Sequence, residues 1–245
     1  MDDYSSAAYG DQVAEFYDAW FSEWLDSADA VGRLAELGGS GPVLELGIGT
    51  GRVALPLLER GIAVHGIDGS EAMVARLRAK PGGDRIPVTI GDFSELPVDG
   101  SFSLVFAAAG TFFELQSQEA QVRCFANVAR HLQPGGVFVI DALLPDATRY
   151  QGNQGMRMIR ATPGNLVLQF RQLNPAEQRL ESHYMMVSNH DLQLMSARFR
   201  YAWPGELDLM ARMANLKLRE RLGSWRGQPF TAESTHHVSI YELPE

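Results

Sequence analysis

The stretch VLELGIGTG, from Val43 to Gly51, decides how the chain folds. An apolar run enters a loop with glycine at every second position, so a buried strand must end abruptly and turn back into a helix. Gly47 and Gly49 let the backbone pass close beneath a ligand where any Cβ would collide. A helix predicted from Val53 to Glu59 points its free N–H groups at the same place, which favours a negative or hydrogen-bond-accepting group. The stretch therefore predicts a binding site for a small molecule.

The spacing of the glycines narrows the class of ligand. A dinucleotide-binding fingerprint places its third glycine one residue later, where this chain has Arg52, and it suits a pyrophosphate. A nicotinamide-dependent oxidoreductase is therefore only the third-ranked function. The GxGxG spacing, with Glu45 inside the preceding strand, instead resembles motif I of the class I S-adenosylmethionine (SAM) methyltransferases, in which the glycines flank the methionine part of the cofactor.

Two carboxylates follow the next two strands. Asp68 ends a strand predicted over 62–67, about twenty residues beyond the glycine loop, where a carboxylate can accept both hydroxyls of a ribose. An alternative role for Asp68 as a helix cap is already filled by Ser70. Asp92 and Phe93 follow a strand predicted over 88–90. In the family that the chain resembles, an acidic residue here hydrogen-bonds the adenine amino group, and the next backbone N–H meets the ring.

The alternation of strands and helices from Pro42 to Asp141 predicts a parallel sheet covered on both faces. Leu-x-Pro-Gly-Gly at 132–136 is a further feature of class I methyltransferases. Four extended runs separated by turn signals then predict an antiparallel flap; they cover 156–161, 166–173, 180–187 and 192–203. A helix from Pro204 and two last strands complete the sheet. The resemblance implies an α/β, Rossmann-like, doubly wound sheet of seven strands in the order 3-2-1-4-5-7-6, with the flap inserted after strand 5.

Three regions are expected on this basis. Residues 1–40 would form an N-terminal helical lid of two helices, residues 41–148 with 204–245 the SAM-binding core, and residues 149–203 an antiparallel β substrate cap. The first helix carries an apolar stripe at helical spacing, which is typical of core packing; its members are Val13, Phe16, Trp20 and Trp24. Tyr17, at the margin of the stripe, resembles the tyrosine of a Tyr-Asp pair that closes over the cofactor in small-molecule methyltransferases.

Composition excludes several function classes. A net charge of −9 argues against nucleic acid as a partner, because phosphates are bound by basic surfaces. The single cysteine, Cys124, rules out an internal disulfide and a thiolate metal cluster, and its helical pattern indicates core packing. No apolar run is long enough to span a membrane, and the acidic N-terminus does not resemble a signal or transit peptide. The expected location is the cytoplasm, and a homodimer is left open.

The resemblance implies SAM as cofactor, S-adenosyl-L-homocysteine (SAH) as its product, and no metal. The residues expected to bind the cofactor are Tyr17, Glu45, Gly47, Gly49, Gly51, Asp68, Gly69, Met73, Asp92, Phe93 and Ala109. Methyl transfer from a sulfonium depends chiefly on orientation, which can supply roughly 7 to 11 kcal/mol. An amine acceptor needs only to be neutral, whereas a hydroxyl acceptor usually requires a base.

Candidates for such a base lie in the flap. Alternation along a strand places Glu181, His183 and Met185 on one face and Ser182, Tyr184 and Met186 on the other, and one of the two faces must cover the cofactor. His183 and Tyr184 are therefore the two catalytic candidates. Both are also ordinary residues of a half-exposed strand.

Two further features bear on the acceptor. The flap holds six arginines, which could steer an anionic substrate or lie solvated on the outer face: Arg157, Arg160, Arg171, Arg179, Arg198 and Arg200. Gly110, at the end of the fourth strand, offers no side-chain polar group where comparable methyltransferases carry Asn or another hydrogen-bonding side chain.

These observations favour SAM-dependent methyl transfer to an oxygen or nitrogen of a small molecule, in secondary metabolism. The alternative is an enzyme of methyltransferase fold that binds SAM or SAH without methylating, and performs an elimination or cyclisation or serves a partner subunit. Only the lack of a polar side chain at Gly110 favours that alternative.

Overall fold

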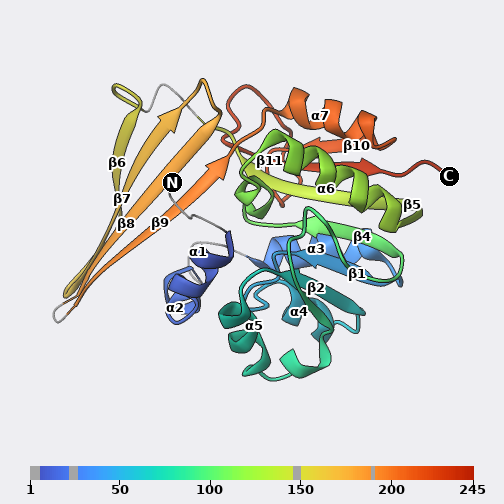
Figure 1. The fold of residues 1–245 in the computed structure, drawn as a ribbon, viewed down its shortest axis with the longest axis horizontal. Helices are drawn as coiled ribbons and strands as arrows, with labels where there is room; N and C mark the ends of the chain where they lie inside the picture. The colour runs from blue at the N-terminus through green and yellow to red at the C-terminus, as the bar shows by residue number, and fades with distance from the viewer. Residues whose placement is uncertain (1–5, 22–26, 146–149, 189–190) are drawn as a thin grey trace.

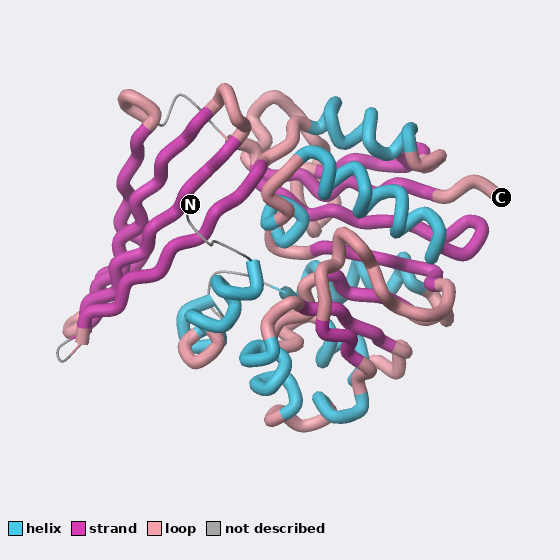
Figure 2. Tube along the Cα trace, in the orientation of Figure 1, coloured by secondary structure: helices cyan, strands magenta, loops and turns pink. Residues whose placement is uncertain are grey.

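A seven-stranded sheet forms the body of the protein, and a separate four-stranded sheet stands beside it (Figures 1 and 2). The computed structural model describes residues 6–21, 27–145, 150–188 and 191–245. The helices are α1 (Ser6–Val13), α2 (Tyr17–Phe21), α3 (Ser27–Gly38), α4 (Ala54–Glu59), α5 (Glu71–Arg78), α6 (Gln118–His131) and α7 (Pro204–Met213), with short 3₁₀ helices η1 (Gly83–Arg85) and η2 (Thr111–Glu114). The strands are β1 (Val43–Leu46), β2 (Val64–Asp68), β3 (Val88–Ile90), β4 (Phe102–Ala107), β5 (Leu132–Leu143), β6 (Gln154–Thr162), β7 (Asn165–Asn174), β8 (Arg179–Ser188), β9 (Leu192–Arg200), β10 (Lys217–Leu222) and β11 (His236–Glu242).

The large sheet has the predicted order. Its strands run β3-β2-β1-β4-β5-β11-β10, which is 3-2-1-4-5-7-6 when only the strands of this sheet are counted. The first five are parallel, and β11 pairs antiparallel with both β5 and β10. The strand order reverses between β1 and β4, so their carboxyl ends open the crevice in which doubly wound sheets bind ligands.

Alternation along the central strands builds one core on each face of this sheet. Leu44 and Val105 point to the face that α6 and α7 cover, whereas Val43, Leu104 and Phe106 point to the face that α3 and α4 cover. All five side chains are fully buried. The two cores hold the sheet rigid between helical layers, which fixes the positions of the loops at its carboxyl edge.

Cys124 lies in the core between α6 and the sheet. Its side chain is completely buried among the aromatic residues of that core, and burial raises the pKa of its thiol. This agrees with the core packing predicted for it.

The N-terminal segment differs from the sequence prediction. One amphipathic helix was expected across the stripe of Val13 and Phe16, but α1 ends at Val13, a tight turn follows in which the Phe16 N–H donates to the Val13 carbonyl, and a separate α2 begins at Tyr17. Val13 and Ala14 are buried against Met73 of α5 and methionines of the small sheet. The turn lets α1 pack there while Tyr17 faces the glycine loop. Trp24 and the side chain of Trp20 lie outside the described residues.

The small sheet, called the flap below, is antiparallel in the order β6-β7-β8-β9. Its four strands occupy the four predicted runs, although β9 ends at Arg200 instead of Trp203. The chain must leave the strand there because Pro204 begins α7, with Trp203 as its extended N-cap.

A buried ion pair fastens the flap to the body. The Arg200 guanidinium lies 2.7 Å from the Glu206 carboxylate and also donates to the Gln121 side chain of α6. The two charged side chains are only 9% and 17% exposed. The pair thus joins the last flap strand to both helices of one covering layer.

We expect Glu206→Ala to lower the free energy of unfolding by about 3 kcal/mol, because Arg200 would keep a buried charge without its partner. Urea denaturation followed by circular dichroism measures this change. Glu177→Ala is the matched control, since Glu177 pairs with Arg179 at a site where both side chains are more than half exposed, and such pairs contribute less than about 1 kcal/mol. Equal losses in the two variants would contradict the assignment.

Candidate active site

The glycine loop follows β1 and is tied to the neighbouring strand. The N–H groups of Gly47 and Ile48 both donate to the Ile67 carbonyl, at 2.8 and 3.1 Å. Gly47 has a φ of +68°, and a Cβ there would collide with the Thr111 side chain. The sequence needs glycine at this position both for the turn and for the close approach of η2.

Asp68 joins the glycine loop to the turn before α5. Its Oδ2 accepts the Gly49 N–H at 2.7 Å and its Oδ1 accepts the Ser70 N–H at 2.8 Å. Burial raises the pKa of Asp68, and these two hydrogen bonds act in the opposite direction. The Ser70 side chain caps α5 by accepting the Met73 N–H, as the sequence predicts. Each Asp68 oxygen keeps a second lone pair for a ligand hydroxyl.

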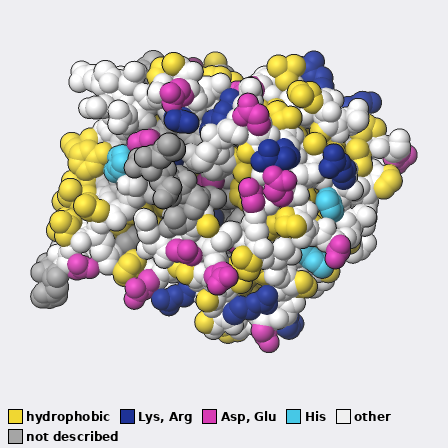
Figure 3. All heavy atoms as spheres, viewed as in Figure 1, with side chains coloured by type: hydrophobic (Ala, Val, Ile, Leu, Met, Phe, Trp, Pro, Cys, Tyr) yellow, Lys and Arg dark blue, Asp and Glu magenta, His cyan; other side chains and the backbone are white. Residues whose placement is uncertain are grey.

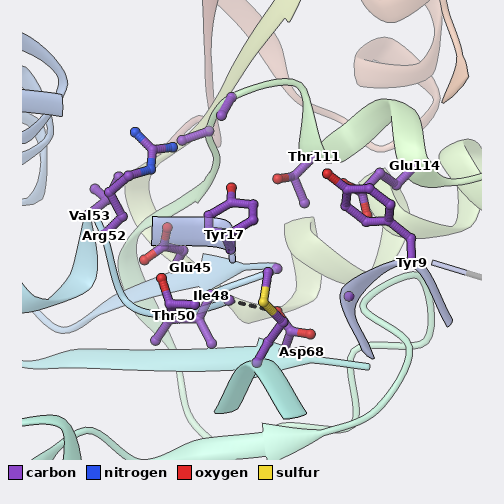
Figure 4. Close-up of a pocket in the computed structure, with 16 residues that line it drawn as sticks. Tyr9, Tyr17, Glu45, Ile48, Thr50, Arg52, Val53, Asp68, Thr111 and Glu114 are labelled. Carbon is purple, nitrogen blue, oxygen red and sulfur yellow. Dashed lines mark hydrogen bonds between the residues drawn. The ribbon is translucent and has the colours of Figure 1, made fainter. Parts of the chain in front are cut away.

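Two cavities meet at this edge of the sheet, and Figure 4 shows the first of them. Both are lined by Gly47, Asp68 and Glu114, so they are parts of one trough. The first also takes in the expected residues Tyr17, Glu45, Gly49, Met73 and Ala109. The second has a volume of about 300 Å³ and takes in Gly69, Asp92 and Phe93. Ten of the eleven expected cofactor residues therefore line the trough.

Gly51 lines neither of these two cavities. Its φ is +78°, and a Cβ there would collide with the Leu77 side chain of α5. In this structure Gly51 serves the turn into α4 and the packing of α5 against it.

Glu45 is a buried carboxylate without a full set of partners. It is 5% exposed, and its Oε2 has no hydrogen-bond partner. Burial raises its pKa to about 8, against the opposing charge of Arg52. The same arginine hydrogen-bonds the Tyr17 side chain, whose pKa is raised, chiefly by burial. The first cavity thus offers one cation and one unsatisfied acceptor side by side.

The second cavity offers an apolar wall and an exposed acceptor. Ile90 is 46% exposed, which is high for an isoleucine at the end of a strand, and Phe93 is buried behind it. Asp92 accepts the Ser94 N–H through Oδ1, which leaves its other oxygen for a ligand. This combination suits a flat heteroaromatic ring with an amino group. Sequence reasoning identified Asp92 and Phe93 but missed Ile90, whose exposure depends on β3 being an edge strand.

Glu114 is another residue that sequence reasoning missed. The segment after β4 turns through Ala109 and Gly110, with φ values of +58° and +82°, and η2 then carries Glu114 back into the trough. Figure 4 shows Glu114 beside Tyr9 and Thr111, across the cavity from Glu45. Burial raises the pKa of Glu114 to about 8, and the charge of Asp68 acts in the same direction. A titratable carboxyl therefore lies where the two cavities join.

A buried aspartate holds the turn after β4 in place. Asp141, at the end of β5, accepts the Ala109 N–H at 2.9 Å and the Trp225 indole N–H at 3.1 Å. Burial raises its pKa. The contact with Asp141 explains how a residue with a Cβ is kept at positive φ at position 109.

The two catalytic candidates of the flap lie on opposite faces of β8, as alternation requires. Tyr184 is on the trough side, where it packs against the cluster that includes Met186 and Met195, but it lines neither cavity. Its hydroxyl accepts from the Gln169 side chain at 2.6 Å. Burial raises the pKa of Tyr184. His183 is exposed on the other face, where its Nδ1 lies 2.7 Å from the Ser196 hydroxyl. The structure does not bring His183 to the trough.

Three of the six flap arginines form ion pairs with glutamates. Arg179 pairs with Glu177, Arg198 with Glu181, and Arg200 with Glu206. Arg157 donates to the Gln169 side chain on the trough side. Arg171, also on that side, hydrogen-bonds Tyr184 and has a buried Nε without a partner. Among the described residues, no carboxylate lies within ion-pair distance of Arg171.

This geometry defines a Rossmann-like protein whose trough suits an elongated ligand, with a charged group at the first cavity and a flat ring at the second. Comparison with known proteins identifies the family. A family model described as a methyltransferase domain matches residues 43–136. The cypemycin N-terminal methyltransferase of a Streptomyces species is 30% identical over 202 residues, which cover 82% of each protein.

Solved structures agree over the whole chain. The CcbJ methyltransferase from Streptomyces caelestis is 36% identical, with a TM-score of 0.90 over 99% of this chain and 100% of that one. SAM-bound CalS10, an amino pentose methyltransferase from Micromonospora echinaspora, shares the fold at 18% identity, with a TM-score of 0.71 over 94% and 96% of the two chains. The chain belongs to the class I SAM-dependent methyltransferases, in their small-molecule group. SAM is its cofactor, as the sequence predicts.

We expect Asp68→Ala to weaken SAM binding by about tenfold or more, because the variant loses a charge-assisted pair of hydrogen bonds and releases Gly49 and Ser70. Isothermal titration calorimetry measures the affinity. Asp99→Ala, an exposed aspartate outside both cavities, is the control. An unchanged affinity in a folded Asp68 variant would remove Asp68 from the site.

Proposed function

We propose that this methyltransferase transfers the methyl group of SAM to a nitrogen of a small molecule in secondary metabolism. The observation that carries the proposal is Glu114, a carboxyl of raised pKa at the junction of the two cavities. The printed names of relatives lend support, because they describe an N-terminal methyltransferase and an amino pentose methyltransferase. An oxygen acceptor, the other alternative from the sequence, is the first rival. The cytoplasmic location and the lack of a nucleic-acid partner stay predictions. Within the described ranges, none of the helices has both the length and the hydrophobicity of a membrane span.

The residues of the trough fit SAM in one orientation. Glu45, with its unpartnered buried oxygen, would hold the ammonium of the methionine part, and Arg52 its carboxylate. Asp68 would accept the ribose hydroxyls, and Asp92 the adenine amino group. Gly47 lies against both cavities, and its backbone would lie beside the sulfur. Tyr17 and the N-terminal helices would then act as the lid expected for residues 1–40.

Glu114 would bind and deprotonate the acceptor. When bound, SAM supplies an electrophilic methyl group on a sulfonium. Glu114 in its ionised form attracts the ammonium form of an amine and accepts a proton from it, which frees the nitrogen lone pair for attack. Tyr9 and Thr111 beside it would orient the same group. With Glu114 present, the lack of a polar side chain at Gly110 no longer favours an enzyme that binds SAM without methylating.

The direct test is incubation of the protein with SAM labelled in its methyl group and a small-molecule extract of the cells that carry the gene. We expect one labelled product of low molecular mass, with the label on nitrogen by fragmentation in mass spectrometry. Label on oxygen would overturn the choice of nitrogen. Tight SAM binding without any labelled product would favour the non-methylating alternative.

We expect Glu114→Gln to lower kcat by about 100-fold and to leave SAM affinity nearly unchanged. In the unaltered enzyme, kcat should rise with pH through about 8, because Glu114 is protonated below its pKa and ionised above it. The variant should lose that dependence. Glu119→Gln, at an exposed position in the first turn of α6, is the control. A variant with unchanged kcat and pH profile would exclude Glu114 from the reaction.

The residues on the trough side of the flap indicate which chemical group the acceptor carries. Its middle is polar: Gln169 and Ser182 are fully buried, the Ser182 hydroxyl has no hydrogen-bond partner, and Arg171 lies opposite Ser182 in the strand register. Apolar residues pack at both ends of this side, near Leu180 and near Met186. We therefore expect the acceptor to carry an anionic or strongly polar group that Arg171 meets.

Arg171→Gln should accordingly raise the KM for the acceptor by at least about tenfold, since it removes a charged hydrogen-bond donor. SAM affinity and kcat at saturating acceptor should change little. Steady-state kinetics with the labelled product as readout separates these quantities. Arg179→Gln changes the same residue type on an ion-paired, exposed strand end and should have no effect. A fall in kcat alone would contradict the assignment.

A further inference from the structure

A third cavity adjoins the trough at Arg52. Its volume is about 320 Å³, and its lining comes from the ends of β4 and β5, the start of β11, the loop after β10 and α3. Neither Asp68 nor Glu114 lines it. Four residues line both this cavity and the first one: Arg52, Val53, Ala108 and Ala109. The proposed methyl transfer makes no use of this space.

Strand pairing places the third cavity on one face of the large sheet. Asp141 of β5 lies opposite Val238 of β11 in the antiparallel register. Alternation puts Asp141 on the same face as Val139, and His236 on the same face as Val238. Both valines belong to the core that α3 and α4 cover. The flap joins the core on the other face, so the third cavity is separate from the side on which the acceptor is expected.

The Asp141 carboxylate offers this cavity an open hydrogen-bond acceptor. Its Oδ2 accepts both the Ala109 N–H and the Trp225 indole N–H. None of the described residues donates a hydrogen bond to Oδ1. Asp141 lines the cavity and is not fully buried, so Oδ1 is available to a ligand. One oxygen of this carboxylate therefore holds the protein together, and the other can bind.

The Trp225 indole forms an apolar wall near the same carboxylate. The Trp225 side chain packs against the core that α3 and α4 cover, and its N–H donates to Asp141. Ser224 and Thr235 also line the cavity. The other apolar lining residues are Ala30, Val53, Ala108, Leu143 and Val238. Apolar walls with a few polar groups are typical of small-molecule sites.

The charges around the third cavity favour a cation as its ligand. Arg52 and His236 also line it, but the Arg52 guanidinium hydrogen-bonds Tyr17 at the first cavity, and His236 is exposed to water. Asp141 is less exposed, so water screens its charge less. The chain carries a net charge of −9, and Figure 3 shows acidic side chains distributed among the basic ones on the visible face. The overall field therefore attracts a cation and repels an anion.

We propose that the third cavity binds a small organic amine in its ammonium form while SAM occupies the trough. The ammonium would donate to Asp141 Oδ1, and an apolar ring would lie against Trp225. A volume of about 320 Å³ is near the lower limit for ligand cavities, which suits a body of one or two rings. The proposal holds whichever acceptor atom the enzyme methylates.

The ligand would bind the ionised form of Asp141. Burial raises the pKa of Asp141, whereas its two N–H donors and the charges of His236 and Arg52 act in the opposite direction. An ammonium beside Oδ1 would add to this second effect, because a nearby positive charge stabilises a carboxylate. A neutral or anionic ligand of the same shape would not.

Isothermal titration calorimetry with tryptamine tests the proposal, on protein saturated with SAH so that the trough is filled. We expect tryptamine to bind at least about tenfold more tightly than tryptophol, which carries a neutral hydroxyl in place of the ammonium. Indole-3-acetate, which carries a carboxylate, should not bind. Failure of tryptamine to bind, its competition with SAH, or equal binding of tryptamine and tryptophol would each overturn the proposal.

Two matched variants separate the third cavity from the acceptor site, because ionised Glu114 also attracts an ammonium. Asp141→Asn should weaken tryptamine binding by at least about tenfold, since it removes the charge of the hydrogen-bond acceptor. Glu114→Gln likewise replaces a carboxylate with an amide and should leave tryptamine binding unchanged. Weaker binding in the Glu114 variant, or full binding in the Asp141 variant, would place tryptamine outside the third cavity.

Thr235→Trp tests the cavity without altering Asp141. Thr235 is exposed and lines the third cavity, so an indole at this position should fill the space and block tryptamine. Thr235 lines neither part of the trough, so the SAH affinity should stay the same and report that the variant is folded. Tryptamine binding of unchanged affinity in a folded Thr235 variant would contradict the proposed site.

Discussion

Asp68 is the residue on which the rest of the site depends. Its two carboxylate oxygens accept backbone N–H groups from the glycine loop and from the start of α5, at 2.7 and 2.8 Å. One side chain at the end of β2 therefore sets the distance between the two segments that form the floor of the trough. The neighbouring sheet is packed on both faces, so this distance cannot relax. Burial of the carboxyl concentrates its field on whatever occupies the trough.

The sequence predicts the sheet well because the sheet obeys local rules. Residues 43–51 specify a strand, a turn that only glycine permits and a helix, and the repeated alternation of elements specifies parallel pairing. The family resemblance then assigned Asp68 and Asp92 to the carboxyl edge, where the structure has them. Residues such as Gly47 are predictable because a steric requirement leaves no other choice of side chain.

The acceptor side of the site could not be predicted in the same way. Glu114 reaches the trough only because η2 turns back after Gly110, and no local sequence pattern predicts that turn. Alternation correctly separated His183 from Tyr184 but could not tell which face turns inward. Hydrophobicity, the usual guide, does not separate the two faces of this flap, because both faces carry apolar residues. The break after Val13 likewise depends on contacts with α5 and the flap, which lie far away in sequence.

The burial of Cys124 has a practical consequence for experiments on this enzyme. It is the sole thiol of the chain and is completely enclosed, and its raised pKa keeps it uncharged and unreactive. A cysteine introduced at any exposed site would then be the one position that accepts a maleimide dye or a spin label in the folded protein. Pairs of such labels, one on α1 and one on the flap, would report whether these two packed elements separate while the enzyme turns over.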